Sequence, residues 1–140
     1  MNPLIVPGKL DSLSQIAQYV LAAAAEAELE KKASYGLRLA VDEIATNIII
    51  HGYEESGSEG NLELCAELSD RNLTIVIEDT AVIYDPIEQA LPSDLDKNLH
   101  EKSIGGLGVY LAIQGVDKFS YERVENRNRN IFTVERKGNR

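Results

Sequence analysis

An acid, an amide and an imidazole recur at steps of four in one apolar stretch, AVDEIATNIIIHGY (40–53). They are Glu43, Asn47 and His51. Residues four apart lie side by side on a helix, so a carboxylate would stand next to an amide. A carboxylate can accept a proton from a hydroxyl group, and an amide oxygen can bind Mg²⁺. The structural alternative stays open: Glu43 would be salt-bridged, Asn47 would bond to backbone, and His51 would cap or pack near the helix end.

A second candidate is Asp79, which stands where an apolar strand runs out into a loop. Its carboxylate could accept a hydrogen bond from an exocyclic amine such as that of adenine. The alternative is an ordinary aspartate that caps a turn at the end of a strand. The residue type and its place therefore suggest, without deciding, a site for a base.

The third candidate is the run IGGLG (104–108), which opens a helix after a long polar segment. Glycines let backbone N–H groups approach a ligand closely, and a helix N-terminus carries partial positive charge, so the run favours phosphate. Glycines also simply terminate loops. Neither GxxxxGK[ST] nor a GxGxxG after a first strand is present, which argues against a P-loop and a Rossmann site.

Hydrophobic periodicity predicts the elements that position these residues. Helices are expected at about 12–27, 30–53 and 106–117, and strands at 4–7, 61–68, 73–79, 118–124 and 130–137. Asp11 or Ser12 can cap the first helix, because Ser12 and Gln15 have capping-box spacing. Grouped helices and hairpins indicate an α+β fold of two layers, with helices on one face of a mixed, mainly antiparallel sheet.

Composition limits the class of protein. The 140 residues suit one domain, 1–140, with its own hydrophobic core. A net charge of −9 argues against a nucleic-acid-binding protein. We expect no membrane span and no signal peptide, because apolar runs are short and the N-terminus lacks a basic start. Cys65 is the only cysteine, which excludes an internal disulfide and fits a cytoplasmic location. One cysteine and two histidines argue against a zinc site.

Taken together, the three candidates resemble the boxes of the Bergerat-fold (GHKL) ATPases, and most closely those of the small anti-sigma-factor serine-protein kinases of bacteria. DEIATNIIIHGY (42–53) resembles the N-box of that family, and EDTAVIYDP (78–86) resembles the box around its adenine-binding aspartate. The stretch from 103 to 137 resembles the glycine box and the closing hairpin. The resemblance covers nearly the whole chain and implies the Bergerat fold.

By position, the resemblance implies a role for each candidate. Glu43 would be the general base toward a serine or threonine, Asn47 would bind Mg²⁺, and Asp79 with Ala81 would contact adenine. Gly105, Gly106, Leu107 and Gly108 would hold the ATP phosphates beneath a lid at about 93–104, from which Lys102 could offer a charge. The implied partners are a STAS-type antagonist as substrate and a sigma factor, with a homodimer possible and the regulation of transcription as the outcome.

The chain departs from the family pattern at one point. The family reads Asp-x-Gly where this chain reads Asp79-Thr80-Ala81. If the position needs a positive φ, alanine costs about 1 kcal/mol, so we expect reduced rather than abolished nucleotide binding. Two alternatives follow: a binding module that keeps the fold and sequesters a partner without catalysis, and a phosphate-binding hydrolase without a protein substrate.

Overall fold

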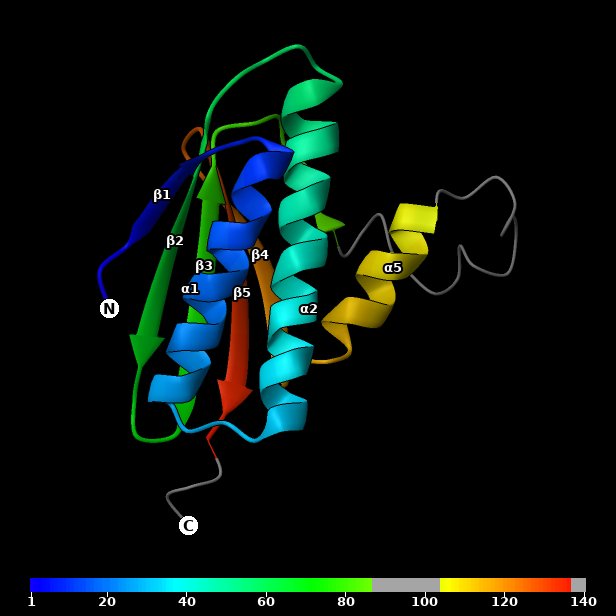
Figure 1. Cartoon of the computed structure of the whole chain (residues 1–140). Helices are drawn as coiled ribbons and strands as arrows, with labels where there is room; N and C mark the ends of the chain where they lie inside the picture. The colour runs from blue at the N-terminus through cyan, green and yellow to red at the C-terminus, as the bar shows by residue number, and fades with distance from the viewer. Residues whose placement is uncertain (87–103, 137–140) are drawn as a thin grey trace.

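The structure, a computed structural model, describes residues 1–86 and 104–136 as two layers (Figure 1). One layer is a five-stranded sheet in the order β1-β2-β3-β5-β4. Its strands are β1 (Leu4–Pro7), β2 (Asn61–Leu68), β3 (Asn72–Asp79), β4 (Lys118–Val124) and β5 (Arg127–Glu135). The predicted α+β class is confirmed, and every pairing among the described strands is antiparallel.

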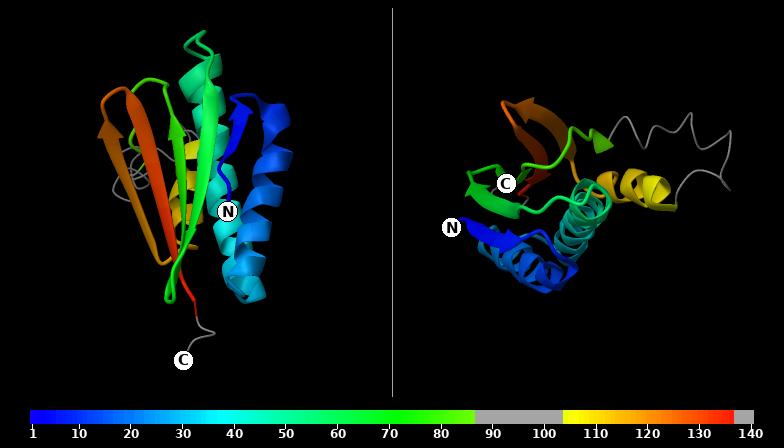
Figure 2. Two further views of the ribbon diagram at one scale, coloured as in Figure 1. Left: turned by 90° about the vertical axis from the view of Figure 1, so that its left-hand side faces the viewer. Right: turned by 90° about the horizontal axis from the view of Figure 1, so that it is seen from above.

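The second layer consists of α1 (Leu13–Glu26) and α2 (Lys31–Asn47), which cover one face of the sheet (Figure 2). The helix α5 (Ile104–Ile113) packs against α2. Almost all of the predicted lid, with Lys102, lies outside the described residues. Among the described helices, none has the length and apolar character needed to cross a bilayer.

Alternation along the three central strands builds the core. Side chains at every second position face the helices, and they are buried in β2, β3 and β5. The apolar members are Leu62, Leu64, Ala66, Leu73, Ile75, Ile77, Phe132 and Val134. They meet the apolar stripe of α2, which is Leu37, Val41, Ile44 and the following Ile48. The inward face becomes polar only at the end of the sheet where β3 finishes and β5 begins, and this is where a site can form.

Ser12 does not cap the first helix, so this prediction is wrong. The Ser12 backbone is in the helical region (φ −81°, ψ −13°), whereas a capping residue is extended. Its hydroxyl donates a hydrogen bond to the Pro7 carbonyl at 2.7 Å instead. A short 3₁₀ turn, η1 (Leu10–Ser12), leads into α1 and takes the place of the expected cap.

The predicted single helix over 30–53 is two elements. The α-helical part ends at Asn47, and a π-helical segment, η2 (Ile48–Glu54), continues it. A π-helix uses i→i+5 hydrogen bonds, so more residues are wound into each turn and the side chains change phase. His51 therefore leaves the line of Glu43 and Asn47.

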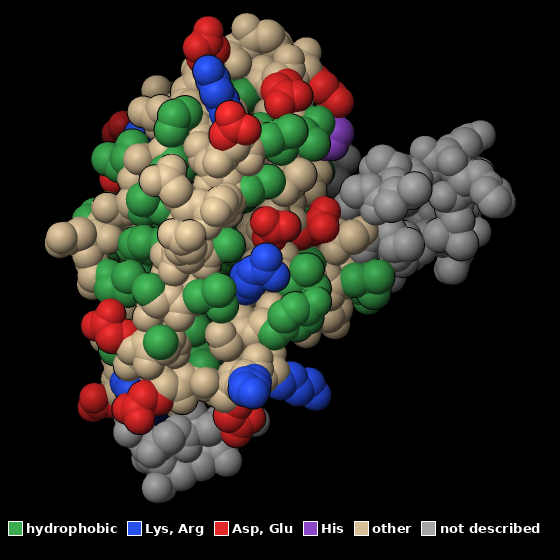
Figure 3. Space-filling view, in the orientation of Figure 1, with side chains coloured by type: hydrophobic (Ala, Val, Ile, Leu, Met, Phe, Trp, Pro, Cys, Tyr) green, Lys and Arg blue, Asp and Glu red, His purple; other side chains and the backbone are tan. Residues whose placement is uncertain are grey.

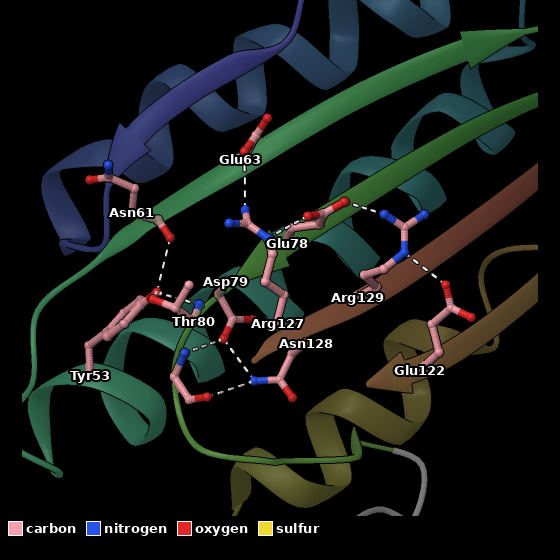
Figure 4. Close-up of polar contacts among 11 residues, drawn as sticks. Tyr53, Asn61, Glu63, Glu78, Asp79, Thr80, Glu122, Arg127, Asn128 and Arg129 are labelled. Carbon is pink, nitrogen blue, oxygen red and sulfur yellow. Dashed lines mark hydrogen bonds and ion pairs between the residues drawn. The ribbon is translucent and has the colours of Figure 1, made fainter. Parts of the chain in front are cut away.

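The outer face of the sheet carries a row of ion pairs, shown in Figure 4. Arg127 binds Glu63 at 3.1 Å and Glu78 at 2.6 Å, and Arg129 contacts Glu78 and binds Glu122 at 2.8 Å. The row joins β2, β3, β5 and β4 on the face opposite the helices. It fixes β5 beside the end of β3 from the solvent side.

A groove of about 830 Å³ runs between α1 and α2 on the helical face. It is partly apolar: Leu21 and Tyr35 line it and are among the most exposed large apolar side chains. Figure 3 shows this face, where apolar side chains alternate with charged ones.

Candidate functional site

Glu43 and Asn47 lie one helical turn apart on α2, at the border of the core. Asn47 is 5% exposed, and its Nδ2 donates a hydrogen bond to the Glu43 carbonyl at 2.9 Å. Among the described residues this is the only hydrogen bond of the Asn47 side chain, which leaves Oδ1 available as an acceptor. The expected hydrogen bond of Asn47 to backbone is therefore present. It uses the amide nitrogen and leaves the amide oxygen as an acceptor.

The Glu43 carboxylate is half-buried against α5. A Cβ added to Gly108 would lie 3.1 Å from Glu43 Oε2 and 3.2 Å from Cδ. Burial raises the pKa of Glu43, and the adjacent Asp42 charge raises it further. A carboxylate with a raised pKa is a stronger base, which suits a group that accepts a proton. Glu43 and Gly108, two of the predicted site residues, are thus brought together, and the missing side chain of the glycine makes room for the acid.

Three of the predicted phosphate-binding residues, Gly105, Gly106 and Leu107, fall in the first turn of α5. The helix begins at Ile104, so these glycines are within it rather than before it. The first backbone N–H groups of a helix have no partner inside it. The N-terminus of α5 can therefore offer these N–H groups to an anion.

Asp79 is the last residue of β3 and is 1% exposed. Its Oδ1 accepts hydrogen bonds from the Ala81 N–H and from Asn128 Nδ2, both at 2.9 Å (Figure 4). Its Oδ2 is buried and has no partner among the described residues. Burial raises the pKa of Asp79, against the opposite effects of those two hydrogen bonds and of the Arg123 and Arg127 charges. An unpartnered buried oxygen is an acceptor that a ligand N–H can satisfy.

The loop that follows Asp79 is held by the β4–β5 hairpin. Asn128 Nδ2 also contacts the carbonyls of Ala81 at 3.2 Å and Val82 at 2.9 Å, and Arg123 Nη1 donates to the Ala81 carbonyl at 3.0 Å. The hydroxyl of Tyr121 donates to Asn128 Oδ1. Every polar atom of the Asn128 side chain is thus engaged, and its function is to fix the backbone after β3.

Tyr53 joins this loop to η2 and to the start of β2. Its hydroxyl donates to the Asn61 carbonyl and accepts from the Thr80 N–H, each at 3.0 Å. The tyrosine is buried, and both hydrogen bonds are partly shielded from water. The end of α2 and the end of β3, which carry Asn47 and Asp79, are therefore tied together.

One small pocket gathers the polar inward residues. Its lining includes Asn47, Asp79, Ala81, Tyr84, Asn128 and Asn130. The cavity measures about 10 Å³, which is roughly the room of one water molecule. A planar base can enter only when part of the wall moves.

The sequence analysis missed Asn128 and Asn130. Both are inward positions of a strand that is otherwise apolar on that face, and they are 2% and 1% exposed. The signal is present in NRNIFTV (128–134), because alternation places two amides on the same face as Phe132 and Val134. A buried amide at the end of an apolar face is unusual and indicates a site.

His51 takes no part in this pocket. Its side chain is 39% exposed, and Nδ1 lies 3.0 Å from Glu55 Oε1 one turn later. His51 is therefore an exposed residue that contacts Glu55 within the helical segment, and neither the predicted site nor the structural alternative of capping or packing describes it.

A family model, the histidine kinase-like ATPase domain, matches residues 6–134. The chain belongs to this family. The elements α2, β3, β5 and α5, which carry the candidate residues, all lie almost entirely within the matched residues.

Curated relatives are regulators and kinases. The chain is 44% identical over 55 residues to the anti-sigma F factor of Clostridium acetobutylicum, which is 39% of this chain and 37% of that protein. It is 33% identical over 79 residues to the serine-protein kinase RsbW of Staphylococcus epidermidis, 53% of this chain and 48% of that protein. The matches thus span about half or less of these relatives.

A solved structure shows the same fold. The histidine kinase domain from the blue-light activated histidine kinase of Erythrobacter litoralis EL346 has a TM-score of 0.55 over 92% of this chain and 61% of that chain. The sequences are 17% identical, so the likeness concerns the fold alone.

Proposed function

We propose that this chain is an ATP-dependent serine/threonine-protein kinase that modifies a small regulatory protein. The observation that carries the proposal is the pocket that Asp79 and Asn47 share, one helical turn from Glu43. Asp79 Oδ2 is a buried acceptor without a partner among the described residues, and an exocyclic amine would satisfy it. The residues therefore fit an aminopurine nucleotide.

In this proposal each residue has one task. Asp79 holds the base through its amine. Asn47 contributes Oδ1 to a Mg²⁺ ion, and the N-terminus of α5 provides N–H groups for phosphate oxygens. The described residues contain no group of three or more His, Cys, Asp or Glu that could hold a metal, so Mg²⁺ would take its other ligands from phosphate and water.

Glu43 would accept the proton of the substrate hydroxyl. Bound ATP supplies the phosphoryl group, and phosphoryl transfer depends mainly on positioning and on neutralising charge. The raised pKa of Glu43 makes the carboxylate a better acceptor for that proton. Gly108 leaves the carboxylate its place beside α5.

The partners we propose follow from what the relatives are called: an anti-sigma F factor and serine-protein kinases. We propose a STAS-type antagonist as the substrate and a sigma factor as the protein that is held inactive, in the cytoplasm. The groove between α1 and α2 exposes Leu21 and Tyr35, which would suit a homodimer contact.

A second candidate function is a binding module that sequesters a partner without catalysis. Two observations favour it: Ala81 stands where the family has glycine, and the pocket holds only about 10 Å³. In this case the polar inward residues would serve the fold alone.

Thermal unfolding in the presence of Mg-ATP separates the two functions. A ligand at 100 times its Kd stabilises a protein by about 2.7 kcal/mol, so the kinase should show a rise in Tm at millimolar Mg-ATP. Transfer of a labelled γ-phosphate to a protein retained from lysate would follow, and Glu43→Gln should bind ATP but lose transfer by a factor of about 10² or more. No rise in Tm at millimolar Mg-ATP would favour the module.

A further inference from the structure

The two buried asparagines of β5 are chemically different. Asn128 uses both its amide N–H groups and its oxygen within the protein. Asn130 is equally buried, at 1% exposed, but its Oδ1 has no hydrogen-bond partner among the described residues. An amide oxygen buried in this way destabilises the free protein unless a water or a ligand donates a hydrogen bond to it, and the cavity beside it has the room of about one water molecule.

The unpartnered oxygen of Asn130 belongs to the same pocket as the unpartnered Oδ2 of Asp79. In the sheet Asp79 pairs with Asn128, and Ile77 pairs with Asn130. Asp79 and Asn130 are therefore diagonal neighbours on the helix-facing side, where side chains stand roughly 7–8 Å apart. Both can reach one edge of an aromatic base.

The two oxygens share a requirement. A carboxylate oxygen and an amide oxygen are both hydrogen-bond acceptors. A ligand that satisfies both must therefore donate two N–H hydrogens. The exocyclic amine of adenine carries two hydrogens on one nitrogen. A purine with a carbonyl at that position would set a third acceptor against these two, and it would offer the single N–H at N1 in place of the two amine hydrogens.

We propose that Asn130 is a second specificity-determining residue of the nucleotide site, which shares with Asp79 the exocyclic amine of the base. This inference rests on the proposed function, because it assumes that a nucleotide binds. It assigns to the amide of Asn130 one of the two amine hydrogens and to the Asp79 carboxylate the other.

The test compares two nucleotides and two proteins by equilibrium binding. ATP and purine riboside triphosphate, which lacks the amine, are titrated into the unmodified protein and into Asn130→Leu. Removal of the amine should cost the unmodified protein two hydrogen bonds and Asn130→Leu only one. The ratio of the Kd for purine riboside triphosphate to the Kd for ATP should therefore be about tenfold smaller in the variant. Asn72→Leu makes the same chemical change on the outer face and should discriminate as the unmodified protein does.

A fold control and a second variant keep the outcomes apart. Nucleotide-free Asn130→Leu should have a Tm equal to or above that of the unmodified protein, because an unpartnered polar group has been removed. If the leucine side chain does not fit the pocket and the variant does not fold, Asn130→Ala is tested in its place. Undiminished discrimination in a folded variant would overturn this inference and leave the kinase proposal intact, whereas absence of nucleotide binding by the unmodified protein would overturn both.

Discussion

The methyl group of Ala81 lies directly against Gly52. A Cβ built on Gly52 would be 2.9 Å from the Ala81 Cβ, which is closer than two carbon atoms can pack. The described residues other than glycine with positive φ are Glu28 and Glu125, so Ala81 does not need the left-handed region. The conformational cost considered for Ala81 in the sequence analysis does not arise, because its φ is not positive. The methyl group is accommodated by the glycine that it faces in η2.

This contact predicts coupling between positions 52 and 81. Gly52→Ala alone should destabilise the protein by about 1–3 kcal/mol through overpacking, and Ala81→Gly alone by about 1 kcal/mol. The double variant should lose clearly less than the sum, because the methyl group has only changed sides. Urea unfolding of the four proteins measures this, and strictly additive free energies would contradict it.

Gly108→Ala should affect catalysis more than binding. The added methyl group would press on the Glu43 carboxylate, 3.1 Å from Oε2, and displace it by a few tenths of an ångström. We expect phosphoryl transfer to fall tenfold or more while ATP affinity changes less than threefold. Leu111→Ala, on the exposed side of the same helix, is the control and should change neither. Equal losses in binding and transfer would place Gly108 in nucleotide binding instead.

Asp79→Asn should stabilise the nucleotide-free protein in a pH-dependent way. Burial raises the pKa of Asp79 in the folded state, so folding disfavours the ionised form and this penalty is present above the folded pKa. At pH 7 the free energy of unfolding of the variant should exceed that of the unmodified protein by about 1–3 kcal/mol. The difference should vanish below the pKa that Asp79 has in the unfolded chain. ATP binding should be lost. Parallel Tm curves from pH 4 to 8 would contradict the assignment.

Asn47→Ala should abolish the dependence of ATP binding on Mg²⁺. The proposed ligand is Oδ1, and its loss removes the only metal contact we assign to the protein. Thr46→Ala is a matched control, because Thr46 Oγ1 donates to the Asp42 carbonyl four residues earlier just as Asn47 Nδ2 does to Glu43. Titrations with and without Mg²⁺ should agree in Asn47→Ala and differ in Thr46→Ala. Retained Mg²⁺ dependence in the Asn47 variant would remove it from the metal site.

Most of the fold could be predicted because buried apolar residues recur at the regular spacing of a strand or a helix. Apolar residues recur at every second position in β2 and β3, and α2 carries an apolar stripe, so each element can be recognised from its own residues. The π-helical segment could not be predicted in this way. Ile48–Glu54 contains no residue that excludes an α-helix, and the contact of Tyr53 with the Asn61 carbonyl is made with a residue outside the segment.

The candidate site was predictable in part for a related reason. Glu43, Asn47 and Asp79 are polar residues in apolar runs, which a single sequence displays. Asn128 and Asn130 stand in ENRNRN (125–130), which reads as a polar turn, although β5 already begins at Arg127. Alternation with Phe132 and Val134 places these amides on the inward face, and the paired register shows that they lie beside Asp79.

The π-helical segment also determines how many residues the chain must have between Asn47 and Tyr53. The phenol of Tyr53 meets Asn61 and Thr80 only at the present spacing. Loss of one residue would change the angle at which all later side chains leave the segment and carry the ring away from the sheet. This stretch can therefore accept substitutions at exposed places such as His51, but it cannot change in length.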